Sequence, residues 1–507
     1  MTTTATKSGA VRGSLKNFGN ARWAGAWLAR PLASFHLVVT IATLLTVLGL
    51  VMVLSASSVE AYAGGRSAYA LFIQQAMFAA IGCGLFYLAL RLPLKRLRQW
   101  SFPMFALSVL ALALVLVPGI GSEVQGARRW FVLGPISVQP SEIVKVTLVV
   151  WGAHLLASRR SERAGLKDIL VPLVPAGLLV CLLVVLQPNL STTIALGVVL
   201  AALLWFGGLP VRLFITIAIS GVIAAGVLAV SAGYRSDRVR SFFNPGADPL
   251  GANYQARQAQ YSLADGGIWG RGLGQSRAKW SYLPNSHNDF IFAIIGEELG
   301  FLGCALVLGL FALFVYTGLR IAARSADPFL RLLTATATTW ITAQALINIG
   351  YVVGLLPVTG LQLPLVSAGG SSLAITLFMF GIIASAARHE PEAVAALHGG
   401  ADGRFSRLLR LPKPEVYSPA KAASSARARN AARNQAQQRK RPQAQQPPRA
   451  RQSQPPRARQ PQPPARRPQP GADGAGKNRR GTSSLRSTRA WEPNYPMPHA
   501  RERGRDR

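Results

Sequence analysis

The chain has 507 residues, of which 50% are hydrophobic, and a formal net charge of +35. These two properties belong to different parts of the sequence. Residues 36–387 are apolar runs separated by short loops, whereas residues 388–507 are rich in Arg, Gln, Pro and Ala and hold about half of all Lys and Arg. This division excludes a uniform soluble protein. It predicts a membrane domain followed by a basic tail.

The first 35 residues are basic and contain no short apolar stretch with a cleavage site. We therefore interpret them as a cytoplasmic lead and not as a signal peptide. The three cysteines, Cys83, Cys181 and Cys304, each lie inside an apolar run and are far apart in the sequence. They do not form the spacing of a disulfide framework or a zinc site.

Ten apolar stretches follow in chain order, several of them close to the roughly 20 residues that a helix needs to cross a bilayer. They are 36–55, 70–90, 101–118, 141–157, 169–186, 191–206, 213–231, 289–319, 333–355 and 371–387. The predicted fold class is an all-α polytopic membrane protein of about ten transmembrane helices, residues 36–387. We expect the tail, residues 388–507, to be disordered because it has few aliphatic residues and high charge.

The distribution of basic residues orients these spans. Lys and Arg gather in the lead and in the second, fourth and eighth loops, which share one side if there are ten spans. By the positive-inside rule that side is the cytoplasm, so both termini are cytoplasmic. The long outside loop, residues 232–288, is also basic. It is either a solvated surface or a site for phosphate or another anion, whose oxygens match the arginine fork.

Polar residues at the ends of the spans are candidates for chemistry. Asp289 falls where the long outside loop enters a helix, so it could cap that helix or act as a general base. Glu297 and Glu298 are adjacent in an apolar run, and we expect at least one to face a polar interior. We interpret their roles as structural or gating.

Two further clusters stand out. Arg128 and Arg129 precede Glu142 and Lys145, which are one helical turn apart and could pair with each other; the pair could also be purely structural. The Pro- and Gly-rich stretch 356–372 predicts a broken or re-entrant backbone that lines a cavity, or else only tight turns. A Walker loop, an HExxH motif and a CxxC pair are all absent from the sequence, which makes ATP hydrolysis improbable.

Four segments in this order closely resemble the SEDS family of shape, elongation, division and sporulation proteins. They are residues 126–130 with 139–142, residues 254–274, residues 283–300 and residues 354–372, and the resemblance extends over residues 36–390. The double arginine, the stretch 238–254 and the basic tail favour the cell-division branch, which is FtsW-type and similar to actinobacterial members, over the elongation branch.

The resemblance implies a peptidoglycan glycosyltransferase that polymerises lipid II outside the cytoplasmic membrane, at the division septum. Asp289 matches the essential loop aspartate of the family and would be the general base. The candidate substrate-binding residues are Arg128, Arg129, Glu142, Lys145, Arg238, Lys279, His287 and Ser371. Some of these cations would stabilise the pyrophosphate leaving group. A divalent cation, Mg²⁺ or Mn²⁺, could share this task, but no cofactor is required with certainty and no metal ligand is assigned.

The chain departs from the family pattern at two positions. Asn189 stands where relatives usually have Asp, so a role for a carboxylate there is in doubt. Ala368 stands where many relatives have Tyr, which removes a ring and a hydroxyl without touching the expected chemistry.

The expected partners are a class B penicillin-binding transpeptidase (FtsI-type), other divisome proteins and membrane lipids. The tail could bind anionic inner-leaflet lipids or a cytoplasmic partner; nucleic acid is not expected because aromatic residues for base stacking are nearly absent. Two other functions stay open: a lipid II flippase, which would need a continuous polar path across the membrane, and a non-catalytic division scaffold that recruits the transpeptidase.

Overall fold

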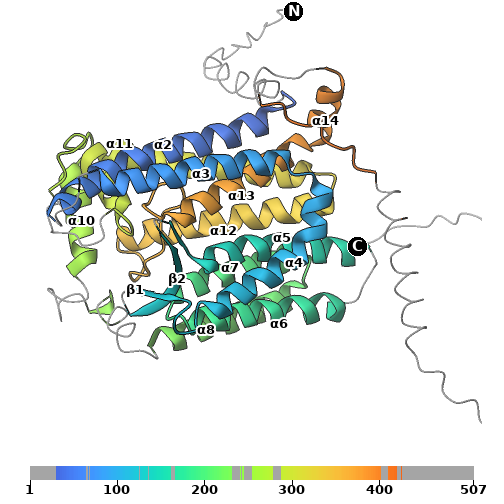
Figure 1. The fold of residues 1–507 in the computed structure, drawn as a ribbon, viewed down its shortest axis with the longest axis horizontal. Helices are drawn as coiled ribbons and strands as arrows, with labels where there is room; N and C mark the ends of the chain where they lie inside the picture. The colour runs from blue at the N-terminus through green and yellow to red at the C-terminus, as the bar shows by residue number, and fades with distance from the viewer. Residues whose placement is uncertain are drawn as a thin grey trace, which may run out of the picture. The chain divides into compact units, whose positions relative to one another are not determined.

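The structure, a computed structural model (Figure 1), describes the larger part of the chain. The described residues are 30–63, 67, 69–124, 126–134, 136–161, 166–230, 240, 242–244, 254–277, 287–400, 409–418 and 424. The chain divides into two compact units, Met1–Lys440 and Arg441–Arg507. All described residues belong to the first unit.

Each of the ten predicted spans corresponds to a helix. The helices are α2 (Ala33–Ala63), α3 (Ala70–Arg91), α4 (Leu94–Leu114), α5 (Pro140–Ser161), α6 (Leu166–Val185), α7 (Leu190–Phe206), α8 (Val211–Val230), α11 (Ile291–Arg324), α12 (Pro328–Val352) and α13 (Ser371–Arg388). Among the described residues, seven helices are long and apolar enough to cross a membrane, and α6 and α7 include shorter apolar helices. The remaining one, α12, carries buried threonines, Gln344 and Asn348. Such polar side chains need a protein interior at membrane depth.

The segment 119–140, between two of the predicted spans, contains a small antiparallel sheet. Its strands β1 (Ser122–Val124), β2 (Ala127–Leu133) and β3 (Ile136–Val138) pair in chain order. Gly126 and Gly134, with φ of 75° and 63°, lie between successive strands, in a backbone region that glycine enters without a steric cost. The sequence did not predict these strands because they are short and depend on pairing with one another.

Two further helices lie outside the predicted spans. Between the seventh and eighth predicted spans, residues Tyr254–Gly266 form α10, and after α13 residues Pro391–His398 form α14. Figure 1 shows α10 and α14 near opposite ends of the long helices.

The residues after 388, which we expected to be disordered, include α14 and the described segment 409–418. After α14, the segment 409–418 returns to the helices: Tyr87 on α3 donates a hydrogen bond to the Leu409 carbonyl at 3.2 Å, and Arg388 on α13 donates one to Pro412 at 3.1 Å. At the end of α11, Arg324 forms ion pairs with Glu390, at 3.7 Å, and with Glu392. These polar contacts hold a segment whose composition alone resembles the rest of the tail.

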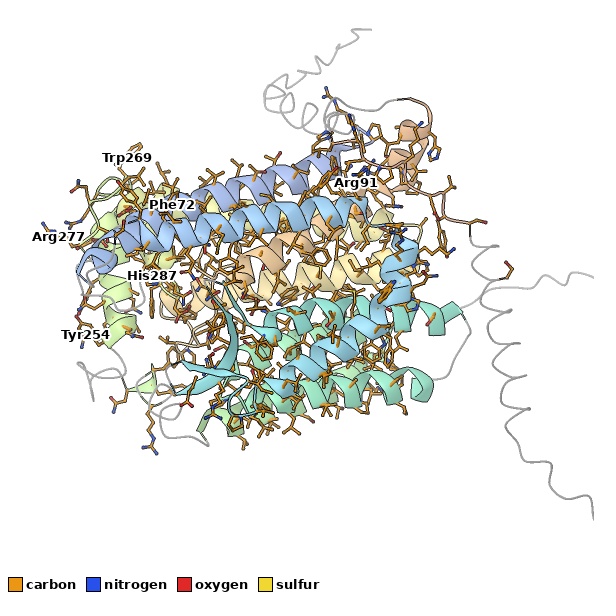
Figure 2. All side chains as sticks on the ribbon, viewed as in Figure 1. Phe72, Arg91, Tyr254, Trp269, Arg277 and His287 are labelled. Carbon is orange, nitrogen blue, oxygen red and sulfur yellow. The ribbon has the colours of Figure 1, made fainter. Side chains whose placement is uncertain are left out.

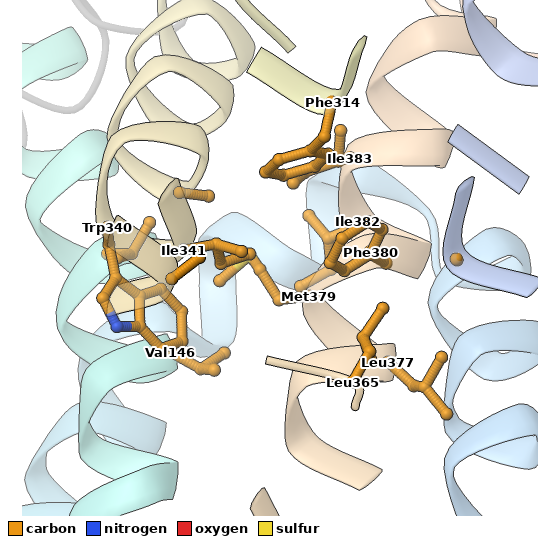
Figure 3. Packing of buried hydrophobic residues seen from close by; sticks show 14 of the residues in the cluster. Val146, Phe314, Trp340, Ile341, Leu365, Leu377, Met379, Phe380, Ile382 and Ile383 are labelled. Atoms are coloured by element: carbon orange, nitrogen blue, oxygen red, sulfur yellow. The ribbon is translucent and has the colours of Figure 1, made fainter. Parts of the chain in front are cut away.

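Helix α13 lies at the centre of the packing, with most of its residues buried. Figure 3 shows Leu377, Met379 and Phe380 of α13 among apolar side chains of α5, α11 and α12. The rings of Phe314 and Phe380 stack with centroids 4.6 Å apart. In contrast, no residue of α8 between Val211 and Leu228 is buried, as expected for a helix that faces lipid.

Candidate active site

Asp289 lies in the turn that leads into α11. The residue at the N-cap position of α11 is Phe290, which makes no side-chain capping bond, so Asp289 is not the N-cap residue of this helix. Its backbone carbonyl accepts hydrogen bonds from Asn348 Nδ2 at 3.0 Å and from Tyr351 Oη at 2.7 Å. Both donors belong to α12, which therefore fixes the backbone of Asp289 from the protein interior.

The carboxylate of Asp289 lies against the irregular segment between α12 and α13. A Cβ atom built on Gly360 would be 3.4 Å from Asp289 Oδ2. Gly360 has a φ of 78°, a conformation that favours glycine. This backbone can therefore approach the carboxylate closely.

A row of polar side chains on α12 connects these parts of the site. Asn348 Nδ2 and Tyr351 Oη also lie 2.7 and 2.8 Å from the Leu361 carbonyl. One turn earlier, Gln344 Nε2 donates to the Gln362 carbonyl at 3.0 Å, and Gln362 in turn donates to Asn288 at 2.7 Å. The sequence analysis missed these residues, although a glutamine and an asparagine four positions apart in a span are a detectable signal.

Glu142 and Lys145 form a buried ion pair on α5. The atoms Glu142 Oε1 and Lys145 Nζ are 2.8 Å apart, and the side chains are 9% and 1% exposed. Ser372 donates to the second oxygen of Glu142 at 3.0 Å, while Lys145 Nζ lies 3.4 Å from Gln344 Oε1 and 5.0 Å from the Trp340 ring centroid. These further partners are what a buried ion pair needs, and they join the pair to the α12 row.

The two adjacent arginines of β2 have different partners, because successive side chains of a strand point to opposite faces. Arg129 donates to the carbonyls of Gln187 and Pro188, at 3.0 and 2.9 Å, and so holds the turn between α6 and α7. Arg128 forms an exposed ion pair with Glu123 at 3.2 Å. An exposed pair is weak and can exchange partners, so Arg128 is available to an anionic ligand.

Asn189 is the N-cap residue of α7: its side chain accepts a hydrogen bond from the Thr192 N–H at 3.2 Å. Asparagine and aspartate cap helices about equally well. Asn189 in place of the family's usual aspartate therefore preserves the helix cap but removes the negative charge. Next to it, Ser191 on α7 hydrogen bonds to the Thr359 carbonyl.

The segment 353–370 has no regular secondary structure, and most of residues 361–369 are buried, in agreement with the expected interruption of the helical backbone. The first turns of several helices surround it. Gln75 of α3 donates to the Ser367 carbonyl at 3.0 Å, Ala368 N–H donates to the His287 carbonyl at 3.1 Å, and Ser371 of α13 accepts from the Gln139 N–H at 3.3 Å. The N-terminal ends of α3, α5, α7, α11 and α13 thus meet around one segment.

Not every predicted site residue can be placed. Arg238 and Lys279 lie outside the described residues. Figure 2 shows His287 toward the same end of the helices as Tyr254 and Arg277, away from Arg91. Within the described ranges no group of three or more His, Cys, Asp or Glu side chains could hold a metal ion.

Comparison with known proteins decides the family. The model of the family FtsW/RodA/SpoVE, described as "Cell cycle protein", matches residues 35–392. The chain belongs to this family. The predicted SEDS membership and polytopic fold are confirmed.

The relatives agree with this assignment. The chain is 58% identical over 395 residues to "Probable peptidoglycan glycosyltransferase FtsW" of Mycobacterium tuberculosis, covering 78% of this chain and 75% of the relative. It is 36% identical over 354 residues to "Stage V sporulation protein E" of Bacillus subtilis, covering 70% and 96%.

Two solved structures are also similar. One, concerned with the structural coordination of polymerization and crosslinking by a peptidoglycan synthase complex, gives a TM-score of 0.56 at 30% identity and covers 70% of this chain and 97% of the other. The other is the rod shape determining protein RodA of Thermus thermophilus, with a TM-score of 0.54 at 28% identity, covering 72% and 99%.

Proposed function

We propose that the chain is a peptidoglycan glycosyltransferase that polymerises lipid II during septal cell-wall synthesis, with Asp289 as its general base. The observation that carries this proposal is the position of Asp289. Its carboxylate lies against Gly360, in the segment around which the N-terminal ends of five helices gather, and its backbone is fixed by Asn348 and Tyr351. The reaction class comes from relatives that are named "Probable peptidoglycan glycosyltransferase FtsW".

In this reaction the 4-hydroxyl of the acceptor sugar attacks the anomeric carbon of the donor. A bond forms between that oxygen and the anomeric carbon, and the bond from this carbon to the lipid pyrophosphate breaks. The hydroxyl proton must leave as the attack proceeds. A carboxylate within hydrogen-bond reach can accept it, which is the role that we give to Asp289.

The pyrophosphate leaving group gains negative charge and needs positive partners. The N-terminus of a helix carries a positive partial charge and free N–H groups, which favour phosphate. Such helix ends gather around the segment that contacts Asp289 at Gly360, and Arg128 on β2 adds a guanidinium whose ion pair with Glu123 is exposed. Lys145 is already neutralised by Glu142, so we give this pair the role of shaping the site.

This chemistry sets the orientation in the membrane. Lipid-linked sugars are polymerised on the outer face, so the ends of the helices around Asp289 face outward, and both termini are cytoplasmic. The basic residues of the lead and of the second, fourth and eighth loops support this orientation. The protein is multi-pass in the cytoplasmic membrane, and its place is the division septum.

The partner is a class B transpeptidase that crosslinks the new strands. The similarity to a structure of a peptidoglycan synthase complex that coordinates polymerization and crosslinking supports this choice. The other expected partners are divisome proteins and membrane lipids.

The test is polymerisation of labelled lipid II by the purified protein with its transpeptidase, comparing wild type with Asp289→Asn. We expect glycan chains from the wild type and a rate about 10²- to 10⁴-fold lower from the variant, since the amide cannot accept the proton. Glu392→Gln, in an exposed pair on α14, is the control and should keep the wild-type rate.

Other outcomes would redirect the proposal. Equal polymer from wild type and Asp289→Asn would remove Asp289 as the base. A folded complex that makes no polymer in either form would favour the flippase or the scaffold instead.

A further inference from the structure

Helix α11 is broken at Gly300, where φ is 68° and ψ is −164°. A break exposes backbone groups that would otherwise bond within the helix. Here the loop after α10 satisfies them from both sides. Phe301 N–H donates to Gly267 at 2.9 Å and Leu302 N–H to Ile268 at 3.3 Å, while Arg271 and Gly272 N–H donate to the carbonyls of residues 297 and 298 at 2.9 and 3.0 Å.

The loop can reach the break only because glycines face it. A Cβ atom on Gly266 would be 1.9 Å from the Gly296 carbonyl oxygen, and one on Gly270 would be 2.2 Å from the Glu298 carbonyl oxygen. The two backbones are therefore in direct contact. Figure 1 shows α10 beside one end of α11.

The side chains of the two adjacent glutamates extend this contact in different directions. Glu297 Oε2 accepts from Ser276 Oγ at 2.7 Å, and Glu297 Oε1 accepts from the Arg277 N–H at 2.6 Å. Both oxygens of Glu298 accept from Ser55 of α2, at 2.6 and 2.8 Å. Both glutamates are 1% exposed, and the distances of 2.6–2.7 Å are those of charge-assisted bonds.

We propose that Glu297 is a positioning residue for the glycosyl transfer. Its backbone belongs to the first part of α11, which follows Asp289 directly. Its carboxylate binds Ser276 and Arg277. Glu297 thus ties the segment that follows α10 to the part of α11 that begins beside Asp289. This inference rests on the proposed function, in which Asp289 accepts the proton.

A positioning role and a direct chemical role of Glu297 predict opposite effects of a glutamine substitution on activity. In Glu297→Gln, the amide oxygen can still accept from Arg277 N–H, and the amide nitrogen can donate to the Ser276 hydroxyl, which is donor or acceptor. The geometry survives without the charge. Proton transfer or metal binding by Glu297 would not survive the same change.

The experiment compares Glu297→Gln, Glu297→Ala and Ser276→Ala in the full-length protein with its transpeptidase. We expect polymerisation by Glu297→Gln to stay within about threefold of wild type. For Glu297→Ala we expect a kcat about 10- to 100-fold lower with a smaller change in KM, because small displacements of the reacting groups have effects of this size. Glu392→Gln is the matched control for the loss of a carboxylate.

A second readout, hydrogen exchange of the backbone amides 270–277, does not depend on activity. Exchange at the Arg277 amide should be faster in Glu297→Ala and unchanged in Glu297→Gln. If Glu297→Ala does not fold, Ser276→Ala tests the inference instead, since it removes only the hydrogen bond to Glu297 and leaves α11 intact. For Ser276→Ala we expect a kcat at least about threefold lower.

Three results would overturn the inference: a glutamine variant as inactive as the alanine variant with normal exchange, an alanine variant with wild-type kcat, or a folded Ser276→Ala with unchanged rate and exchange. If wild type makes no polymer, the proposed function fails. The hydrogen exchange of amides 270–277 would then still show whether the Glu297 carboxylate holds this segment in place.

Discussion

The hydroxyl of Tyr351 and the amide of Asn348 share a small set of acceptors. Tyr351 Oη lies 2.7 Å from the Asp289 carbonyl, 2.8 Å from the Leu361 carbonyl and 2.7 Å from Asn348 Nδ2. A hydroxyl has one proton to donate and an amide has two. Three donor hydrogens are therefore shared among the two carbonyls and the hydroxyl oxygen. Loss of one donor weakens the hydrogen bonding of both backbone segments, at Asp289 and at Leu361.

This arrangement predicts the effect of Tyr351→Phe. The ring remains, so its edge contact with Phe290, at 5.7 Å between centroids, is kept, but the hydroxyl is lost. We expect a kcat about tenfold lower, because the backbone of Asp289 loses a bond and shifts, with destabilisation of about 1 kcal/mol. The measurement is lipid II polymerisation together with thermal unfolding in detergent.

Tyr316→Phe on the same membrane domain is the control, since Tyr316 is half exposed on α11. It should behave as wild type. A Tyr351→Phe enzyme with an undiminished rate would mean that the hydroxyl does not hold Asp289 in its working position.

The position of Asp289 in the sequence left open whether it is a cap or a base until the family resemblance favoured the base, and the sequence did not lead to the residues that support it. Asn348 and Tyr351 bind backbone carbonyls 59 and 62 residues away in the chain. A carbonyl carries no signal in the sequence, so such pairs become visible only when the segments are brought together. Glu142 and Lys145 could be paired in advance because they lie on one helix, one turn apart.

At the scale of elements, the break in α11 depends on one residue. Gly300 adopts a positive φ, and a Cβ atom there would be 2.3 Å from the Gly270 nitrogen. Gly309, on the same helix, would place a Cβ atom in open space with no heavy atom within 4 Å. The two glycines therefore form a matched pair for substitution.

We expect Gly300→Ala to lower the melting temperature strongly and to free the loop 267–272, because the side chain collides with backbone and the φ is unfavourable for alanine. Gly309→Ala should be neutral or stabilising by about 0.5–1 kcal/mol, the helix propensity difference. Thermal unfolding and limited proteolysis of the loop measure both. Equal melting temperatures for the two variants would contradict the packing described here.

The sequence predicted the long helices because length and hydropathy define a membrane span. It did not predict the break, since Gly300 lies among other glycines of an apolar run and only its contact with Gly270 distinguishes it. The sheet was missed for a related reason. Strands of three to seven residues form through their neighbours more than through their own pattern.

At the scale of the whole chain, residues 409–418 form contacts with the membrane domain through Tyr87 and Arg388. A protein that ends after residue 418 keeps the bonds to Tyr87 and Arg388, so we expect its melting temperature and polymerisation rate to match the full chain. A protein that ends after residue 390 loses α14 and these bonds, and should melt at a lower temperature.

The same truncation after residue 418 tests the tail as a lipid-binding segment. Each basic residue near an anionic membrane contributes about 1 kcal/mol. The full chain, reconstituted with its tail facing the surrounding solution, should bind added vesicles rich in phosphatidylglycerol. This binding should weaken as the salt concentration rises and disappear on truncation. Equal binding before and after truncation would exclude this role.

The break in α11 also changes where its glutamates lie relative to the membrane. A helix rises 1.5 Å per residue, so the 34 residues of α11 would span about 51 Å, well beyond the roughly 30 Å hydrocarbon core. The part after Gly300 alone would span about 36 Å, enough to cross the core. Glu297 and Glu298 lie before this part of the helix, so the core can be crossed without them, and the cost of a polar side chain at the bilayer centre is avoided.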